Sequence, residues 1–548
     1  MQPLRLSVRC YYDGVRPLAF ALFAATLIAQ EPPVLRVTTR VVQVNVVVTD
    51  RSGHPVDGLT QDDFILKEDG RPQQIAGFSV ERSRVLPPPA EPLPPDIFTN
   101  RYELKSGAPS SATAILFDTL NTRQRDKYFA RDEFAKFLRT QLQPSDRVAL
   151  YVLGHDLRLL HDFTSDAAGL LAALDGSPRA IRLLDSFDPD KGGIESSPAA
   201  GAVAIDMKET EKKADEKLSD TYAAVRVYRT AAALEAIGSR LAALPGRKSL
   251  VWITGGIPAY IGLEDELTAR QKRFGVSRLR MFTDQIEQVA RRLGAADVAV
   301  YPVDAQGLLA LPGPRARFPE NYLAARGTLR TLAARTGGRA TVDNNDIAGA
   351  VRRALDDSRI TYTLSYQPTH DQWDGRFRSI KVATRRPGVT LRHRGGYFAD
   401  GEQSVTPQNR EKALDAAIAS PLEATGIRLV VALKPDTPTP GRLAVRILME
   451  PADVRLVQKD GRWTAQLDIA YVQWAVPADP HATAIKRHLE LPLSPAEFQT
   501  ALEKGLVVQD DLNAASSAHL LRIIVHDAST GATGSVEIVR STPASVSK

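Results

Sequence analysis

The chain has 548 residues, a length that predicts roughly three or four domains rather than one hydrophobic core. Hydrophobic residues make up 43% and charged residues 24%, which is ordinary for a soluble globular protein. The formal net charge is +6, but arginines and acids are interspersed, without a lysine-rich tail or a basic-aromatic array. The composition therefore argues against nucleic-acid binding.

The amino terminus is typical of an export signal. Arg5, Arg9 and Arg16 precede an apolar run at 18–29. This run has the length of a signal-peptide core and is too short to span a bilayer comfortably. We expect residues 1–29 to be a signal peptide, cleaved after Ala29, and an uncleaved amino-terminal anchor is the alternative.

The only cysteine, Cys10, lies within this segment. The mature chain would then have no disulfide, no thiolate nucleophile and no cysteine-ligated zinc. An exported chain of this size without disulfides is more typical of a bacterial envelope protein than of an animal secreted one. We expect a secreted, periplasmic or cell-envelope protein with no membrane span after signal cleavage.

Residues 34–84 predict a small β module. In its first strand, residues 42, 44, 46 and 48 are valines on one face, whereas the other face is mixed. This alternation favours a half-exposed strand. Residues 62–66 and the Glu68-Asp69-Gly70 turn indicate a second strand and a hairpin. Residues 85–110 predict a stiff linker, because six prolines fall between Pro87 and Pro95.

Residues 111–400 alternate between apolar strands and helical segments, which predicts an α/β doubly wound domain. The expected strands are 112–117, 147–153, 249–254, 298–303 and 361–366. The expected helices are 126–142, 166–174, 222–244, 283–293, 323–336 and 347–357. Residues 177–219 interrupt the pattern with a mixed-charge run, which we interpret as a solvated helix or a mobile insertion.

The remaining chain is rich in strand patterns. Residues 359–398 either extend the edge of the α/β sheet or link it to the next domain. A short helix is expected at 410–419. Residues 421–541 predict a carboxy-terminal domain like a β-sandwich. Its expected strands are 426–433, 441–449, 466–472, 488–493, 520–527 and 534–539.

Sequence motifs for nucleophilic catalysis are missing: we find no Gly-x-Ser-x-Gly elbow, no His-Glu-x-x-His helix and no Walker phosphate loop. The tightest His/Asp grouping is His155-Asp156 with His161-Asp162. It flanks the return of a hairpin, which favours surface positions over a metal or acid–base role. The loop at 373–376 contains a tryptophan, which more commonly packs on a core than binds a ligand.

The most informative stretch is residues 114–122, an apolar strand that ends in Asp118 and is followed by Asn121 and Thr122. Ligands of open α/β sheets bind beyond the carboxyl ends of the strands. These side chains could therefore offer hard oxygen ligands to Mg²⁺ or Ca²⁺. Alternatively, Asp118 caps the next helix. Gly255-Gly256 and Asp304 lie at the ends of two further strands. We interpret Asp304 as a residue that terminates its strand or caps the following helix.

These segments together resemble a von Willebrand factor A domain, and more narrowly the VWFA-related proteins abundant in acidobacteria. The resemblance rests on segments found in the same order: 37–44, 58–64, 114–122, 247–256 and 300–304. It implies an A-type α/β domain flanked by all-β, sandwich-like domains. It is weaker over the carboxy-terminal β region.

The resemblance also implies a cation site with the pattern Asp-x-Ser-x-Ser, a distant threonine and a distant aspartate. Asp118 matches the first acid, Thr122 the second hydroxyl and, loosely, Thr230 the distant threonine. Leu120 replaces the first serine, Asn121 adds an amide, and the distant aspartate would fall at the glycines 255–256. The candidate ligands of Mg²⁺ or Ca²⁺ are thus Asp118, Asn121, Thr122 and Thr230, and a remodelled, metal-free domain is favoured over an occupied one.

These observations lead to three hypotheses of function. The first is an exported, non-enzymatic interaction or adhesion protein that binds another protein or a cell-surface polymer above Asp118, through an A-type domain with a degenerate cation site. The second is a hydrolase that uses Asp118 with Asp304 or the nearby histidines. It is disfavoured because the nucleophile motifs are missing. The third is a structural scaffold of the envelope.

Overall fold

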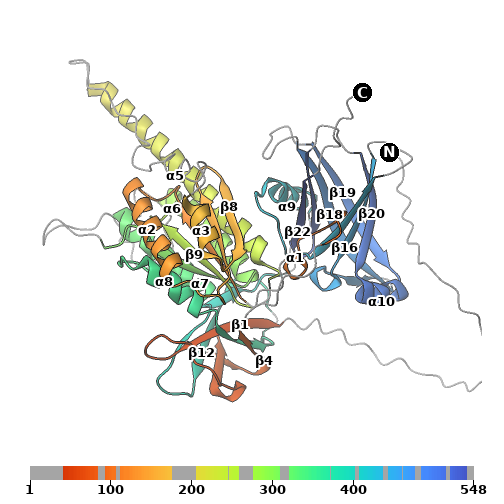
Figure 1. Cartoon of the computed structure of the whole chain (residues 1–548), viewed down its shortest axis with the longest axis horizontal. Helices are drawn as coiled ribbons and strands as arrows, with labels where there is room; N and C mark the ends of the chain where they lie inside the picture. Colours follow the sequence, from red (N-terminus) through yellow and green to blue (C-terminus); the bar gives the residue numbers. More distant parts are fainter. Residues whose placement is uncertain are drawn as a thin grey trace, which may run out of the picture. The chain divides into compact units, whose positions relative to one another are not determined.

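A computed structural model describes residues 41–83, 93–105, 111–175, 205–244, 246–257, 276–308, 320–370, 372–401, 406–435, 442–459, 461–474, 483–513 and 519–539. The predicted signal peptide lies outside these residues, as do parts of the predicted linker and of the predicted insertion. The described chain is a mixed α/β protein with several sheets (Figure 1).

One sheet carries the α/β part of the fold. Its strand order is β10-β9-β6-β7-β8, and only β8 runs antiparallel to its neighbour. These strands are β6 (Ala112–Asp118), β7 (Val148–Leu153), β8 (Leu157–Thr164), β9 (Lys248–Thr254) and β10 (Val298–Asp304). Every residue of β6, β7, β9 and β10 is buried. Strands that are buried along their whole length are typical of a parallel sheet covered on both faces.

Helices cover both faces of this sheet. One core cluster joins it to α2 (Gln124–Thr140), α3 (Ala167–Asp175) and α8 (Ile347–Asp356). A second cluster joins the opposite face to α5 (Ile205–Leu241), α6 (Val276–Ala295) and α7 (Glu320–Thr336). The predicted insertion thus partly belongs to α5, whose backbone is helical from residue 205. Figure 1 shows the first part of α5, in yellow, extending beyond the rest of these layers.

The small β module is built from two distant chain segments. One sheet has the order β13-β1-β11-β4 and the other β14-β12-β2-β3, and they share one core. The first segment supplies β1 (Val42–Thr49), β2 (Phe64–Glu68), β3 (Arg71–Gln73) and β4 (Ile75–Arg82), with a short 3-10 helix at Gln61–Asp63. The second supplies β11 (Ile360–Tyr366), β12 (Phe377–Thr384), β13 (Thr390–Arg392) and β14 (Gly396–Phe398). Residues 359–398 therefore belong to the small β module. They neither extend the α/β sheet nor form a simple connection to the next domain.

Strand β1 differs from its predicted exposure. It is buried at every position except Gln43, because both of its faces are covered. The even-numbered valines face the core of the β module. On the other face, Asn45 donates to the Asp297 carboxylate that follows α6. The prediction of a half-exposed strand was wrong because the alternation of apolar and polar residues does not reveal a polar contact beneath the mixed face.

The carboxy-terminal part consists of two sheets that share one core. The first has the order β20-β16-β15-β5, with β5 (Ile97–Thr99), β15 (Leu429–Pro435), β16 (Arg442–Met449) and β20 (Leu506–Asn513). The second contains β17 (Val457–Lys459), β18 (Arg462–Trp474), β19 (Thr483–Leu493), β21 (Leu520–Asp527) and β22 (Thr533–Val539). Helices α9 (Pro407–Ala419) and α10 (Pro495–Lys504) and a 3-10 helix at Pro451–Asp453 accompany them. Because β5 pairs with β15, part of the predicted linker is a strand of this domain.

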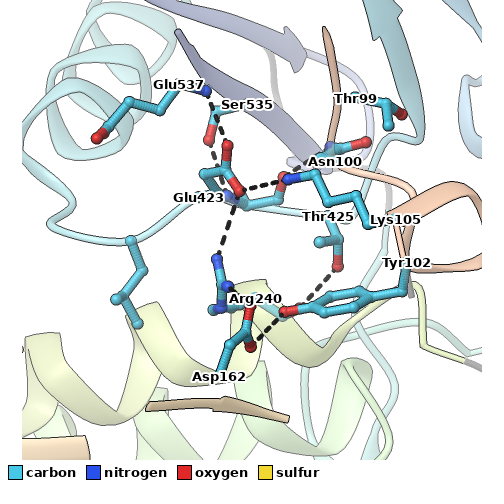
Figure 2. A network of polar contacts seen from close by, with 12 residues as sticks. Thr99, Asn100, Tyr102, Lys105, Asp162, Arg240, Glu423, Thr425, Ser535 and Glu537 are labelled. Atoms are coloured by element: carbon cyan, nitrogen blue, oxygen red, sulfur yellow. Dashed lines mark hydrogen bonds and ion pairs between the residues drawn. The ribbon is translucent and has the colours of Figure 1, made fainter. Parts of the chain in front are cut away.

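A buried arginine connects the α/β layers to the carboxy-terminal domain (Figure 2). Arg240 of α5 donates to Asp162 of β8 at 2.9 Å and lies 3.6 Å from the Glu423 carboxylate. Its guanidinium also lies over the ring of Tyr102 in α1 (Tyr102–Lys105). Thr425 donates to the Arg240 carbonyl at 2.9 Å. One helix thus contacts the hairpin, the polypeptide after β5 and the start of the carboxy-terminal sheets.

Among the described residues, no helix combines the length and the hydrophobicity that crossing a membrane would require.

Candidate functional site

The candidate site lies where the direction of the sheet reverses. From β6 the chain proceeds to β7 on one side, and β9 pairs with the other side of β6. In doubly wound sheets this switch point is the usual position of a ligand crevice. Asp118 ends β6 and Thr254 ends β9, and Asp304 of β10 stands in register with Thr254.

The Asp118 carboxylate is buried and already has several hydrogen-bond donors; its residue is 1% exposed. Oδ2 accepts from Asn121 Nδ2 at 2.8 Å, Thr254 Oγ1 at 2.8 Å and Trp252 Nε1 at 3.1 Å. Oδ1 accepts from the Asn121 backbone amide at 3.0 Å. Burial raises the pKa of Asp118, while these hydrogen bonds oppose the shift. The carboxylate therefore functions as an internal acceptor that organises the loop after β6.

Asn121 links this carboxylate to α5. Its Nδ2 also donates to Thr230 Oγ1 at 2.8 Å, and Thr230 in turn donates to the Arg226 carbonyl at 2.8 Å. A flipped amide would place the Asn121 oxygen against the Asp118 oxygen, so the observed orientation is the one that the network permits. The Asn121 Oδ1 atom is buried without a hydrogen-bond partner among the described residues.

Thr122 completes the loop. It donates to the Asp118 carbonyl at 2.5 Å and accepts from the Gly255 backbone amide at 2.9 Å. A Cβ atom at Gly255 would lie 2.5 Å from the Asn121 carbonyl oxygen. The position of the expected distant aspartate therefore has no room for any side chain, because the loop after β6 contacts the backbone of Gly255 directly.

The structure brings Asp118, Asn121, Thr122 and Thr230 together in one network of hydrogen bonds. Mg²⁺ and Ca²⁺ require several oxygen ligands with free lone pairs. Three donors occupy Oδ2 of Asp118, and the Asn121 nitrogen, not its oxygen, faces that carboxylate. As arranged, these residues do not fit a divalent cation. The described residues also contain no group of three His, Cys, Asp or Glu side chains suited to a metal.

Asp118 does not cap the following helix, which was the alternative prediction. The residue before α2 is Arg123, and no side-chain hydrogen bond caps that helix. Asp118 instead holds the backbone of Asn121, three residues later in the same loop.

The acids and histidines of the hydrolase alternative each have partners other than Asp118. Asp304 forms a buried ion pair with Arg326 at 2.6 Å, and it holds the turn after β10 through the Gln306 amide. His155 lies beside Asp156 at 3.1 Å and is exposed. His161 bonds to the carbonyl of Asp162 at 2.7 Å. These contacts agree with the interpretation that Asp304 terminates its strand.

Sequence reasoning missed a group of exposed apolar side chains around this edge of the sheet, which we call the apolar rim. It comprises Tyr128, Phe129, Tyr222, Val225, Tyr228, Leu308 and Leu323.

Chain connectivity places each of these residues at the same end of the sheet. Tyr128 and Phe129 lie in the second turn of α2, which follows β6. Leu308 follows the end of β10, and Leu323 lies in the first turn of α7. The Thr230 contact with Asn121 fixes which part of α5 reaches this edge, so the α5 members lie at or just beyond it. Hydrophobic periodicity cannot reveal such a group, since exposure depends on which elements meet in the fold.

Comparisons with known proteins give only distant similarity. No family model and no curated protein matches the chain. An aerotolerance-related membrane protein from Bacteroides fragilis is 14% identical, with a TM-score of 0.23, over 45% of this chain and 98% of that chain. BatB from Bacteroides thetaiotaomicron is 14% identical, with a TM-score of 0.21, over 45% and 97%. The PilB minor pilin from Streptococcus sanguinis is 11% identical, with a TM-score of 0.26, over 45% and 61%.

Proposed function

We propose that the α/β layers form an A-type domain that binds a protein partner at the carboxyl edge of its sheet, without a divalent cation. The apolar rim is the observation that carries this proposal. Of the large apolar side chains exposed on the described residues, many gather at the one edge where doubly wound sheets usually bind ligands. The Asp118 network supports the cation-independent form, because hydrogen-bond donors occupy the carboxylate oxygen that would otherwise bind a cation.

The chemistry of the rim favours a protein over a surface polymer. Tyrosine and phenylalanine offer large apolar area at little cost in side-chain entropy, and aromatic side chains are enriched at the centres of protein interfaces. Arg123 and Arg125 are exposed at the start of α2, beside Tyr128 and Phe129. The complementary partner surface is apolar with acidic residues at its border.

We propose that the protein has no enzymatic activity. The carboxylates of Asp118 and Asp304 both stabilise local structure, through the loop after β6 and the ion pair to Arg326. The nearby histidines are engaged at the surface of the β7–β8 hairpin. We further propose that the protein is exported to the cell envelope, on the strength of the sequence of its first 29 residues.

Site-specific photocrosslinking tests the binding face. A benzoylphenylalanine residue replaces Tyr128 or Tyr228 in cells of the source organism, with Leu502 and Val539 as exposed control positions in the carboxy-terminal domain. We expect both rim positions to crosslink to one and the same protein, in EDTA as well as in Mg²⁺, and the control positions not to do so. Crosslinks that require Mg²⁺ contradict the cation-independent form. Equal labelling at rim and control positions, or none, contradicts the binding face and favours an envelope scaffold. Labelling of a polymer contradicts the protein partner.

A further inference from the structure

Two histidines and an aspartate form one row across three neighbouring strands of the second carboxy-terminal sheet. Asp468 of β18 is in register with His488 of β19 and with His526 of β21. The row lies on the sheet face that α9 covers, because Ala470 and Ile524, two positions away along β18 and β21, belong to a core cluster with α9. Asp468 and His526 are buried, whereas His488 is half exposed.

Asp468 anchors the start of α9 to this sheet. Its carboxylate accepts from Arg410 Nε at 3.1 Å and from Nη2 of the same guanidinium. His488 Nδ1 lies 2.6 Å from Asp468 Oδ1. Burial raises the pKa of Asp468, but the hydrogen bonds from Arg410 and His488 outweigh burial, so the net shift is downward. The anchor therefore consists of an ionised carboxylate and a guanidinium, with an imidazole beside them.

His526 is the titratable group that can disturb this anchor. It is 4% exposed, and its Nδ1 lies 2.9 Å from Thr533 Oγ1. The charged groups around it are Asp468 of β18, Asp527 of β21, Arg292 of α6 and Arg410 of α9. Burial lowers the pKa of His526, the two carboxylates oppose this shift, and the two arginines add to it. A proton on His526 would thus be buried next to cations of two helices.

We propose that the attachment of α9 to the carboxy-terminal sheet is acid-sensitive, and that protonation of His526 releases the helix. The added proton places a second cation beside Arg410, next to the same Asp468 carboxylate. After release, His526 is in contact with water and recovers its ordinary pKa, so acid favours the released state. Release also uncovers the apolar sheet face around Val472 and Ile524. This proposal involves neither the apolar rim nor the Asp118 network.

The other titratable groups near α9 set the pH range of the test. His488 Nδ1 must carry a proton in both charge states, because the Asp468 carboxylate only accepts, so titration of His488 keeps this hydrogen bond. Glu411 and Asp415 of α9 contact Lys486 of β19. Carboxyl groups with ordinary pKa values of about 4 stay ionised at pH 5.5. A comparison of pH 7.5 with pH 5.5 therefore isolates the histidines.

Hydrogen exchange of the full chain, measured by mass spectrometry and corrected for the intrinsic effect of pH on exchange, tests the proposal. We expect the amides of α9 to lose protection at pH 5.5 by up to about tenfold, the largest factor that one histidine with an ordinary pKa of about 6.5 can supply. The amides of α2 should lose less. His526→Gln should keep the protection of α9. His393→Gln is the matched control, because burial also lowers the pKa of His393 in the small β module, and it should show the wild-type loss in α9.

A second neutral variant, His526→Asn, guards against a folding defect in the first. Melting temperatures at pH 7.5 close to the wild-type value show that the variants fold. The proposal is overturned by unchanged protection of α9 in the wild type at pH 5.5, by an equal loss in α2 and α9, or by a wild-type loss in α9 of the folded His526 variants.

Discussion

The side-chain amide of Asn121 donates to the Asp118 carboxylate at 2.8 Å, and the same nitrogen donates to Thr230 at 2.8 Å. One neutral side chain therefore joins the end of the central strand to helix α5. The resemblance to A-type domains implies a cation at this place, bound by the same acid and threonine. The geometry instead supports a hydrogen-bonded substitute for that cation, built from Asn121, Trp252 and Thr254.

Substitution Asn121→Asp replaces the donor with a second buried carboxylate of the same size. We expect it to lower the free energy of unfolding by about 2–4 kcal/mol, because an unpaired charge then faces Asp118. We further expect Mg²⁺ or Ca²⁺ to recover much of this loss, since the variant offers two carboxylates. Chemical denaturation with and without the cation measures both effects. Asn121→Ala is the control: it removes the donors without adding an acid, so a cation should not stabilise it.

Substitution Gly255→Ala tests the close approach of the two loops. The added Cβ would lie 2.5 Å from the Asn121 carbonyl oxygen and 3.1 Å from Thr122 Cα, so the loop after β6 must move. We expect a loss of about 1–3 kcal/mol in the free energy of unfolding, typical of overpacking. Gly294→Ala is a matched control, because a Cβ there meets nothing within 4 Å. An unchanged stability of Gly255→Ala would show that this contact is not close in solution.

The sequence predicted the local elements well where their signals are local. The strands that became β6, β7, β9 and β10 have continuous apolar runs, and their observed limits differ from the predicted ones by one residue or less at each end. The predicted helix at 347–357 became α8 (Ile347–Asp356). Positive φ angles at Asp69 and Gly70 accompany the predicted turn between β2 and β3. These features depend on periodicity and turn chemistry, which act over a few neighbouring residues.

Long-range pairing was not predictable in the same way. Residues 360–366 read as a strand, but nothing in their pattern indicates that Tyr366 pairs with Val42, more than 300 positions earlier. Strand β5 is too short to give a signal and gains its structure by pairing with β15. Helix α10 was missed although Ser494 and Glu497 form a capping box, a readable helix start.

The candidate site was predictable in its position and not in its chemistry. An acid at the end of an apolar strand indicates the switch-point edge, and the four predicted ligand residues do meet there. Which atom of Asn121 faces Asp118 depends on the carboxylate itself and on the Thr230 hydroxyl of α5, more than 100 residues later. The apolar rim likewise depends on the fold, which places the first turns of α2 and α7 and the middle of α5 at one edge of the sheet.

Acid should destabilise the fold through His393. Its Nε2 accepts from the Val382 backbone amide at 3.1 Å, while its Nδ1 lies 2.8 Å from the Arg394 carbonyl. Protonation of Nε2 would remove that acceptor, and burial lowers the pKa of His393 below its ordinary value. The unfolded state then binds more protons than the folded state as the pH falls through about 6.5, so stability decreases on acidification.

Thermal melts between pH 7.5 and 5.5 measure this effect. We expect acidification to be less destabilising for His393→Gln than for the wild type. Glu81 and Glu235, whose pKa values are raised by burial, contribute with the opposite sign in both proteins, so the comparison of the two slopes carries the test. Burial also lowers the pKa of His526, so part of the slope should remain in the variant. Equal slopes in His393→Gln and the wild type would contradict the role assigned to His393.

Substitution Arg240→Met tests the connection between the α/β layers and the carboxy-terminal domain. It leaves Asp162 and Glu423 near one another without their shared cation (Figure 2). We expect a loss of about 2–4 kcal/mol in the free energy of unfolding, below the full value for a buried pair because Asp162 is half exposed. Arg442→Met breaks an ion pair with two exposed partners and should cost less than about 1 kcal/mol. Similar losses in the two variants would contradict the connecting role of Arg240.

Cation titration of the wild-type protein tests whether the Asp118 network excludes a divalent cation. Calorimetry and thermal melts are recorded in EDTA and with millimolar Mg²⁺, Mn²⁺ or Ca²⁺. Because internal donors already occupy Oδ2 of Asp118, we predict no binding heat from this site and an unchanged melting temperature. A saturable heat together with a rise of several degrees in the melting temperature, both lost in Asp118→Ala, would show the opposite: that a cation displaces the Asn121 amide.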